Sequence, residues 1–308
     1  MNIDSLLQAN AAILKWYSPY NFNRNISDAH LLTHTYAILQ QHIALNEYVS
    51  IDVEGIEYIF IVKKLEWDTN YFGIPTYKLI NVLSMSYEFI NEATQLFNTN
   101  YLPKNAYCFM EVPAEDISTI QALGNASYKL IETRLTYYNN QLHTHNYPRY
   151  QVRQATKEDI PSLKKVAATM RNNFDRFHAD KTFDMQIADN FLSTYIQNSV
   201  AGYANYVMVP NQKNTASNSF LTANYLQEDW DMIQCKISKM VLSAVSASTN
   251  KGWYIKLISE MTYHLRDTIG AECIYLNTQA TNRAVFSTWE KLGYKLGNTT
   301  HVFSFLNK

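Results

Sequence analysis

The stretch of sequence that decides the fold is KMVLSAVSASTNKGWYIKLISEM, residues 239–261. Its apolar beginning predicts a buried strand, and its end predicts an amphipathic helix. Between them lies a turn of small polar residues, 246–252, which ends in Gly252. A strand that passes through such a turn into a helix can bind phosphate, because the free N–H groups of the first helical turn point at an anion. The segment can therefore form an anion-binding loop, but taken alone it favours an ordinary strand-to-helix connection.

A second strand-and-helix segment follows at residues 273–296, CIYLNTQATNRAVFSTWEKLGYKL. It predicts a buried strand, a helix that Asn282 caps, and a stop at Gly293. Asn282 and Trp289 are seven residues apart, so they share one face of the predicted helix. Two strand–turn–helix segments thus occupy the C-terminal half of the chain.

The two segments together resemble the Gcn5-related N-acetyltransferases. In that family an Asn is followed two helical turns later by an aromatic residue and then by Glu-Lys-Leu-Gly-Phe/Tyr. This pattern falls on Asn282, Trp289 and residues 290–294. The resemblance implies an α/β fold with a mixed central sheet flanked by helices. It also implies acyl-CoA as co-substrate.

The pyrophosphate loop of the same family has the pattern Gln/Arg-x-x-Gly-x-Gly/Ala. It falls here on Thr249, Gly252 and Tyr254. The first position lacks a long polar side chain and the last carries a bulky one, but the central glycine is kept. By this resemblance the CoA-binding residues are Ser243, Val245, Ser246, Thr249, Asn250, Lys251, Gly252, Trp253, Tyr254, Asn282 and Trp289.

The chain has 308 residues, enough for two domains. Residues 143–149, HTHNYPR, form a polar break with a proline, so we place domains at 1–145 and 146–308. Residues 122–138 and 291–305 share a Leu-Gly pair, an aromatic-Lys-Leu triplet and a strand pattern. The N-terminal domain is therefore expected to be a partial repeat of the C-terminal one, with a structural or acceptor-binding role. Chance similarity is the alternative.

Three local patterns stand out in the N-terminal domain. Residues 3–17 have their apolar positions at helical spacing. Residues 48–64 predict a hairpin around the turn Glu54-Gly55. Residues 65–73, LEWDTNYFG, are expected to form an aromatic-rich turn.

A narrower resemblance covers most of the chain. Residues 65–75 (LEWDTNYFGIP), 111–116 (EVPAED) and 174–183 (FDRFHADKTF) resemble two-domain N-acyltransferases of nucleotide-linked amino sugars, of the dTDP-fucosamine acetyltransferase type. That resemblance implies transfer of an acetyl or 3-hydroxybutanoyl group to the amine of a dTDP-linked amino-dideoxy sugar. The amine would attack directly in a ternary complex. The product would serve the synthesis of O-antigen or another surface polysaccharide, as part of lipopolysaccharide biosynthesis. Another amine acceptor, or a non-catalytic CoA-binding module, is the alternative.

Acid and base candidates come from the same resemblances. The base is expected to be His178 or Asp180, or a water relay, and a structural, hydrogen-bonded histidine is the equal alternative for His178. Many relatives protonate the leaving thiolate with a Tyr at the position of Trp289. Because an indole only donates a hydrogen bond, Tyr254, Tyr294 or water must replace it. Residues expected to bind the acceptor are Arg171, Arg176, Phe177, His178 and Lys181, and an ordinary solvated face is the alternative for the charged ones.

Composition limits the function classes. The net charge is −1 and no dense Lys/Arg run occurs, so general binding of nucleic acid is not expected. The three cysteines lie far apart, and we expect buried thiols and no metal site. A signal-peptide pattern is lacking, and no apolar run approaches the roughly 20 residues that span a bilayer. We expect a cytoplasmic protein that does not bind membranes, and the sequence leaves a homodimer open.

Overall fold

The computed structural model describes residues 3–169 and 172–308 and contains two compact units. The N-terminal unit comprises Met1–Arg134 together with Asn298–Lys308, and the C-terminal unit comprises Leu135–Gly297. The units thus divide at residue 134, whereas the sequence placed the division near residue 145. Two long strands, β5 (Lys129–Asn139) and β11 (Lys295–Leu306), each begin in one unit and end in the other.

The sheet of the N-terminal unit has the strand order β1-β2-β3-β4-β11-β5. The antiparallel pairs are β1 with β2, β2 with β3, and β4 with β11, while β3 and β4 are parallel. The predicted hairpin is confirmed, and its turn has Glu54 and Gly55 at φ 52° and 80°. Two positive φ values match the twist of a two-residue hairpin. The strands are β1 (Tyr48–Val53), β2 (Ile56–Lys64), β3 (Thr76–Ser84) and β4 (Tyr107–Pro113).

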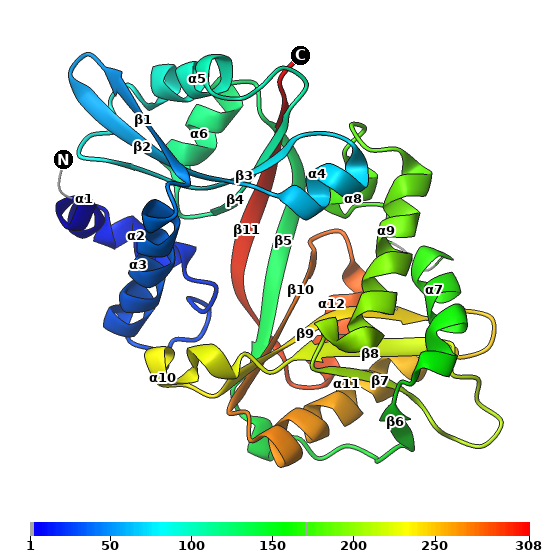
Figure 1. The fold of residues 1–308 in the computed structure, drawn as a ribbon. Coiled ribbons are helices and arrows are strands. Elements are labelled where there is room, and N and C mark those ends of the chain that lie inside the picture. The colour runs from blue at the N-terminus through cyan, green and yellow to red at the C-terminus, as the bar shows by residue number, and fades with distance from the viewer. Residues whose placement is uncertain (1–2, 170–171) are drawn as a thin grey trace. The chain divides into compact units, whose positions relative to one another are not determined.

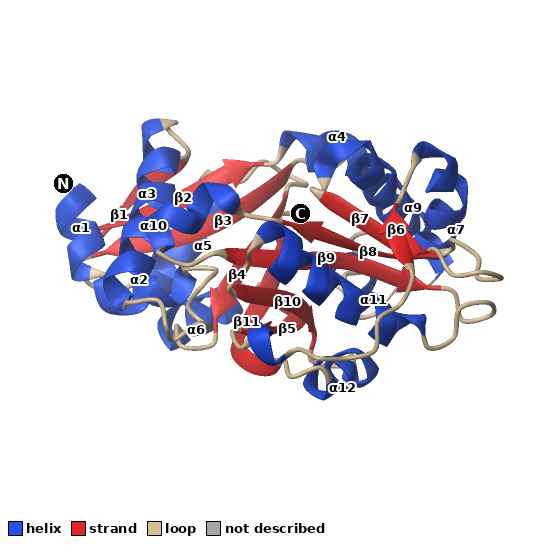
Figure 2. Cartoon of the chain, turned by 90° about the horizontal axis from the view of Figure 1, so that it is seen from below, coloured by secondary structure: helices blue, strands red, loops and turns tan. Residues whose placement is uncertain are grey.

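Helices cover both faces of this sheet, as Figures 1 and 2 show. Alternate residues of β2 therefore enter different cores. Phe60 packs in the cluster of α5 (Ile90–Asn100) and α6 (Ile117–Asn125). Ile59 and Ile61 pack in the cluster of the other helices, since successive strand side chains face opposite ways. Those helices are α1 (Ile3–Ala9), α2 (Ala11–Tyr17) and α3 (Asp28–Ala44).

Two local expectations for this unit need correction. Residues 3–17 form two helices, not one, because Asn10 lies between them at φ −97° and ψ 5° and its side-chain amide donates to Leu6 O and Ser84 O. Residues 65–73 contain the helix α4 (Glu66–Phe72), which Gly73 ends at φ 67°. Glycine takes this left-handed conformation without a Cβ penalty, so it is a usual helix stop.

The sheet of the C-terminal unit has the strand order β11-β5-β10-β9-β8-β7-β6. Strands β6 to β9 pair antiparallel in succession, and β9 and β10 are parallel. The strands of this unit are β6 (Val152–Gln154), β7 (Tyr206–Pro210), β8 (Ser219–Asn224), β9 (Ile237–Val245) and β10 (Cys273–Gln279).

The helices of the C-terminal unit also lie on two faces. On one face α7 (Ile160–Thr169) and α9 (Met185–Asn198) bury Leu163 and Ile196 against Phe220 of β8. On the other face α11 (Trp253–Tyr263) and α12 (Arg283–Lys291) contribute Leu257 and Trp289 to a second core. The short helical segments are α8 (Arg176–Ala179), α10 (Trp230–Ile233), η1 (Leu142–Thr144), η2 (Lys157–Asp159), η3 (Ser199–Tyr203), η4 (Gln227–Asp229) and η5 (His264–Ile269).

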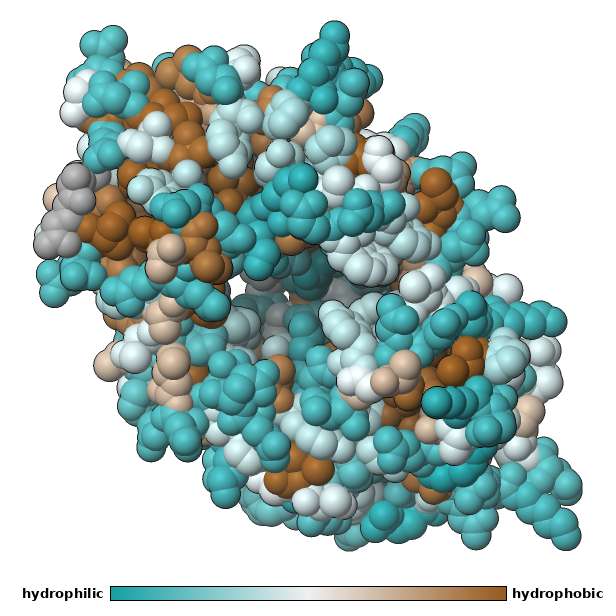
Figure 3. Space-filling model, viewed as in Figure 1, coloured by the Kyte–Doolittle hydropathy of each residue, from teal (hydrophilic) through white to brown (hydrophobic). Residues whose placement is uncertain are grey.

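One face of the molecule is drawn in space-filling form in Figure 3. On the face drawn in Figure 3 most atoms are hydrophilic, and hydrophobic side chains gather in separate groups. This agrees with a chain in which 17% of the residues are charged and many others carry hydroxyl or amide groups. Within the described residues, no helix is both long and apolar enough to cross a bilayer.

Candidate functional site

The parallel strands β9 and β10 stay paired over only a short distance. Their register runs from Ile237 with Cys273 to Lys239 with Tyr275. Beyond that point, β9 continues to Val245 and β10 to Gln279, while β8 remains paired with β9 to its end. The ladder between β9 and β10 therefore stops within the described residues. We call residues 240–245 of β9 the open edge, because their polar groups on this side are not used by β10.

A bulge interrupts β9 within the open edge. Leu221 of β8 pairs with Ser243, and Ala223 pairs with Met240, so β9 has one residue more than β8 here. An extra residue reverses which face the following side chains occupy. Met240 accordingly packs in the core under α11, whereas Ala244, four residues later, packs in the opposite core.

The bulge is held by a side chain of the neighbouring strand. Thr222 Oγ1 accepts a hydrogen bond from Leu242 N at 2.9 Å and donates one to Leu242 O at 3.2 Å. Thr222 is fully buried. The hydroxyl thus satisfies the backbone groups that the bulge removes from the ladder.

The loop between β9 and α11 is built around Gly252 and Asn250. Gly252 precedes the helix at φ 85°, a conformation in which a side chain is strained. Asn250 is 1% exposed, and its amide donates to Ala216 O at 2.8 Å and Ser219 Oγ at 3.0 Å. Buried anchoring on one side and a glycine on the other give the loop a defined path into the first turn of α11.

Hydroxyl groups cluster on the exposed side of this loop. Thr249 Oγ1 donates to Ser246 Oγ at 2.9 Å, and Ser246 Oγ lies 3.2 Å from Ser248 Oγ. Asn218 Nδ2, from the connection between β7 and β8, donates to Thr249 Oγ1 at 2.7 Å. Lys251 is exposed beside them. Hydroxyls, a cation and the positive end of the α11 dipole together form a surface that suits an anion.

Ser243, Tyr254 and Trp289 meet beside the open edge. The indole Nε1–H of Trp289 donates to the Tyr254 hydroxyl at 2.8 Å, and Ser243 also hydrogen-bonds that hydroxyl. Burial raises the pKa of the Tyr254 hydroxyl above its usual range, so the group stays protonated at neutral pH. Because the indole occupies an oxygen lone pair, the Tyr254 proton remains available to an acceptor.

Three comparisons with known proteins bear on this geometry. No protein-family model matches the chain, and no curated protein matches its sequence. Solved structures do match. A Gcn5-related N-acetyltransferase from Sphaerobacter thermophilus aligns over 89% of this chain and 86% of its own, with a TM-score of 0.56 and 9% identity.

Two further structures agree with that match. A GCN5-related glucosamine N-acetyltransferase region of a fungal GH3 beta-N-acetylglucosaminidase aligns over 99% of this chain and 37% of its own, with a TM-score of 0.55 and 12% identity. A protein of unknown function from Staphylococcus epidermidis aligns over 85% and 95%, with a TM-score of 0.52 and 9% identity. The chain has the Gcn5-related N-acetyltransferase fold. The predicted fold class is therefore confirmed.

Helix α12 of this N-acetyltransferase fold starts where the sequence placed it. Asn282 precedes it, but its side-chain amide donates to Thr278 Oγ1 at 3.1 Å instead of capping the helix. Trp289 is 3% exposed and packs edge-to-face on Tyr137, with ring centroids 5.6 Å apart. Tyr294 is also buried, and its hydroxyl lies 2.8 Å from Thr262 Oγ1 in α11. The Tyr294 hydroxyl thus has a partner inside the core.

The imidazole of His178 is clamped between carboxylates. Its Nδ1 lies 2.8 Å from Asp175 and its Nε2 lies 3.1 Å from Asp189 in α9, and the side chain is 0% exposed. Burial lowers the pKa of His178, but the two carboxylates outweigh burial and leave the pKa above its usual value. With both ring nitrogens engaged, this histidine ties α8 to α9 and offers no nitrogen to a substrate amine.

The other acceptor candidates surround that clamp. Asp180 is buried and accepts from Thr182 N at 3.0 Å. The Arg176 guanidinium stacks on Phe177 at 4.3 Å from the ring centroid, and Phe177 packs on Phe191. Lys181 is exposed. Arg171 lies outside the described residues.

Several contacts at the site were not expected from the sequence. Asn172 donates to the side chain of Gln279 at the end of β10, which ties the segment before α8 to the strand beside the open edge. Thr222 and Ser219 of β8 hold the bulge and the loop. No short motif carries these contacts, since each joins elements distant in sequence. No group of three or more His, Cys, Asp or Glu able to hold a metal occurs among the described residues.

Proposed function

We propose that this chain is an acyl-CoA-dependent N-acyltransferase whose site lies at the open edge of β9. The observation that carries the proposal is the meeting of Ser243, Tyr254 and Trp289 beside a strand edge that leads into the Gly252 loop. An elongated thioester with an anionic end suits a site in which a strand edge leads into an anion-binding loop. Its anionic part would face the loop, and its amide groups would hydrogen-bond the backbone of residues 243–246.

Each part of the site has a role in this proposal. Bound acyl-CoA supplies a thioester carbonyl that an amine attacks, with release of the CoA thiol. The N–H groups at the start of α11 and the Lys251 ammonium hold the pyrophosphate. The Tyr254 hydroxyl gives its proton to the departing sulfur, and water returns it. The attacking amine loses its proton to water, because both nitrogens of His178 are already engaged.

The acceptor we propose is the amine of a dTDP-linked amino-dideoxy sugar, and the acyl group is acetyl or 3-hydroxybutanoyl. The support is the resemblance of residues 174–183 to amino-sugar N-acyltransferases. The fungal region of like fold is described as a glucosamine N-acetyltransferase, which makes amino sugars a fitting acceptor class. Arg176 and the exposed Lys181 would face the phosphates. A product of this kind would enter O-antigen synthesis in the cytoplasm.

Thermal unfolding with ligands tests the proposal. We would measure the unfolding midpoint with acetyl-CoA, dTDP and UDP, singly and in pairs, and then follow CoA thiol release with amino-sugar nucleotides. Ligands that bind only the folded state raise the midpoint. A rise with acetyl-CoA, a further rise with one nucleotide, and thiol release would support it. Binding without release would favour a non-catalytic CoA-binding module, and no rise with acetyl-CoA would contradict both.

A further inference from the structure

The N-terminal unit repeats the architecture that carries the candidate site. Its elements β1, β2, β3, α5, β4 and α6 follow one another as β7, β8, β9, α11, β10 and α12 do in the C-terminal unit. Strands β3 and β4 are parallel and pair from Thr76 with Tyr107 to Leu79 with Met110, after which their register ends. The N-terminal unit therefore has an open edge of its own on β3.

The bulge is repeated as well. Ile61 of β2 pairs with Asn81 and Val62 pairs with Leu79, so β3 has one extra residue, as β9 does. Both strands are nine residues long. Counted from the start of each strand, Val82 and Ser84 correspond to Ser243 and Val245. The backbone of these two residues is thus the counterpart of the open edge of β9.

In the N-terminal unit these carbonyls are already occupied. Asn10, which lies between α1 and α2 and is 4% exposed, donates from Nδ2 to Ser84 O at 3.0 Å. The Tyr87 hydroxyl lies 2.9 Å from Val82 O and 2.6 Å from Asn10 Oδ1, so its proton is shared between them. The chain's own side chains make the hydrogen bonds that an elongated amide ligand would make at the other edge.

The helix that follows the parallel strand is engaged in the same way. Asp116 precedes α6, as Asn282 precedes α12. Tyr17, at the end of α2, donates its hydroxyl to Asp116 Oδ2 at 2.7 Å. Burial raises the pKa of Tyr17 well above its usual range, and the Asp116 carboxylate adds to this, so the hydroxyl keeps its proton at neutral pH.

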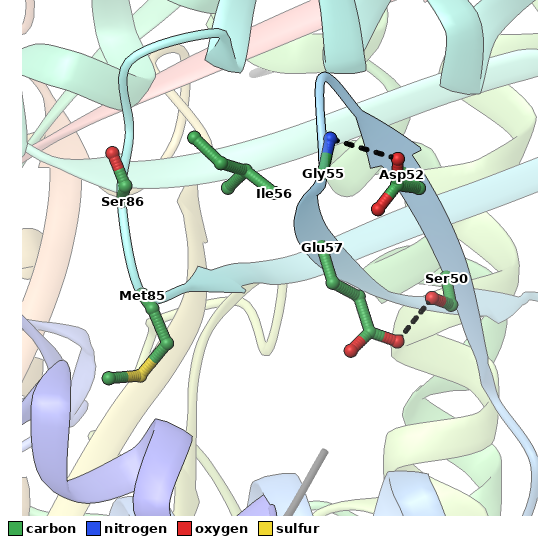
Figure 4. A pocket seen from close by; sticks show the side chains of 7 residues that line it. All are labelled: Ser50, Asp52, Gly55, Ile56, Glu57, Met85 and Ser86. Carbon is green, nitrogen blue, oxygen red and sulfur yellow. Dashed lines mark hydrogen bonds between the residues drawn. The ribbon is translucent and has the colours of Figure 1, made fainter.

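The connection that follows β3 is also unsuited to phosphate. Residues 85–89, MSYEF, contain no glycine. Met85 and Ser86 line a hollow of about 460 Å³ beside the β1–β2 hairpin, which Figure 4 shows. The carboxylates of Asp52 and Glu57 line the same hollow and accept hydrogen bonds from Gly55 N and Ser50 Oγ. Two carboxylates repel an anion where the other unit carries hydroxyls and a lysine.

We infer that helices α1 and α2 permanently fill the co-substrate position of the N-terminal copy, so that each chain takes one acyl-CoA, in the C-terminal unit. The identity of the ligand rests on the proposed function. The occupation itself rests on the contacts of Asn10, Tyr17 and Tyr87, which are within one unit. The N-terminal unit therefore has no co-substrate site in this inference, because the segment of α1 and α2 covers the open edge of β3.

Unfolding without ligand tests the occupation. Asn10→Ala removes the donor to Ser84 O and one of the two acceptors of the Tyr87 hydroxyl, and should lower the midpoint by roughly 3–8 °C. Asn10→Asp keeps the shape but removes the N–H donors, and should also lower it. Gln95→Ala, at an exposed position of α5, is the control and should change it little. Asn10 variants as stable as Gln95→Ala would overturn the inference.

Calorimetric titration with CoA tests the stoichiometry. One site per chain, lost in Gly252→Val and retained in Asn10→Asp, is expected. A second site, or a site that survives Gly252→Val, would overturn the inference. Absence of any CoA binding would contradict the proposed function of the C-terminal unit, and the unfolding of the Asn10 variants would then decide the occupation alone.

Discussion

At the scale of single residues, the acid that we propose for the leaving thiolate is the Tyr254 hydroxyl. It is held by the Trp289 indole and by Ser243, and its raised pKa keeps it protonated. A phenol that accepts from an indole has its own proton directed elsewhere. The proposed acid thus lies on α11, the helix beside the one that carries Trp289.

Replacing Tyr254 by Phe should lower kcat by about 100-fold or more, because positioned proton transfer contributes on that order. The affinity for acetyl-CoA should change only a few-fold, since the ring remains. Steady-state assays of thiol release and calorimetry measure the two effects. Tyr263→Phe is the control, because Tyr263 lies on the same helix as Tyr254 and its hydroxyl donates to Tyr147 O. A Tyr254→Phe enzyme with unchanged kcat would exclude this acid.

His178 should make stability depend on pH. Its pKa is raised in the folded chain, so its contribution is complete below the ordinary histidine value of about 6.5 and is lost as pH rises through the folded value. The difference in unfolding midpoint between the wild type and His178→Gln should therefore shrink from pH 6 to pH 9. Denaturation series at several pH values measure it, and a constant difference would refute the charged clamp.

At the scale of elements, the loop between β9 and α11 is defined by its glycine. Gly252 and Gly270 both have positive φ, at 85° and 78°, and a Cβ at either would meet nothing within 4 Å. Alanine should cost about 1 kcal/mol of stability at each, through backbone strain alone. Comparing the two alanine variants therefore separates the effect of backbone strain from any role of the Gly252 loop in binding a ligand.

Gly252→Ala should weaken acetyl-CoA binding by about 10-fold, because the first N–H groups of α11 would turn away from the anion. Gly270→Ala, at the end of η5, should leave binding unchanged at the same loss of stability. Calorimetric titration and thermal unfolding of both variants provide the measurement. Equal affinities in the two variants would show that the loop does not hold the anionic part of the ligand.

At the scale of the whole molecule, the C-terminal segment Asn298–Lys308 belongs to a different unit from the residues that precede it in sequence. Strand β11 pairs with β4 from Thr300 with Pro113 to Leu306 with Tyr107. Val302 and Phe303 of β11 are buried, and Phe303 packs in the N-terminal core. The N-terminal unit thus depends on residues that follow the entire C-terminal unit in sequence.

Separate expression of residues 1–145 and 146–308 should therefore give two unstable fragments. The first would lack the strand that covers β4, and the second would expose the apolar half of β11. Mixed or co-expressed, the fragments should associate and regain a cooperative unfolding transition. Circular dichroism and size-exclusion chromatography would detect this. A stable, monomeric fragment 1–145 would contradict the role assigned to β11.

The sequence alone determined the features that depend on neighbouring residues. The Glu54-Gly55 hairpin, the loop ending in Gly252 and the helix from Asn282 to Gly293 each follow from local φ preferences and periodicity. The resemblance of residues 282–294 carried the fold class, because that pattern lies within one helix and its stop. These elements could be read directly because their physical causes act over a few residues.

Tertiary structure decided everything that pairs distant segments. Thr222 holds the bulge of the neighbouring strand, and the end of β11 pairs with β4, although these partners lie far apart in sequence. Both nitrogens of His178 are engaged by carboxylates that the local sequence does not distinguish from other carboxylates nearby. The break at Asn10 belongs here too, since its cause is a hydrogen bond to Ser84. Local pattern does not encode which buried donor meets which acceptor, because that choice is made by the packing of the whole chain.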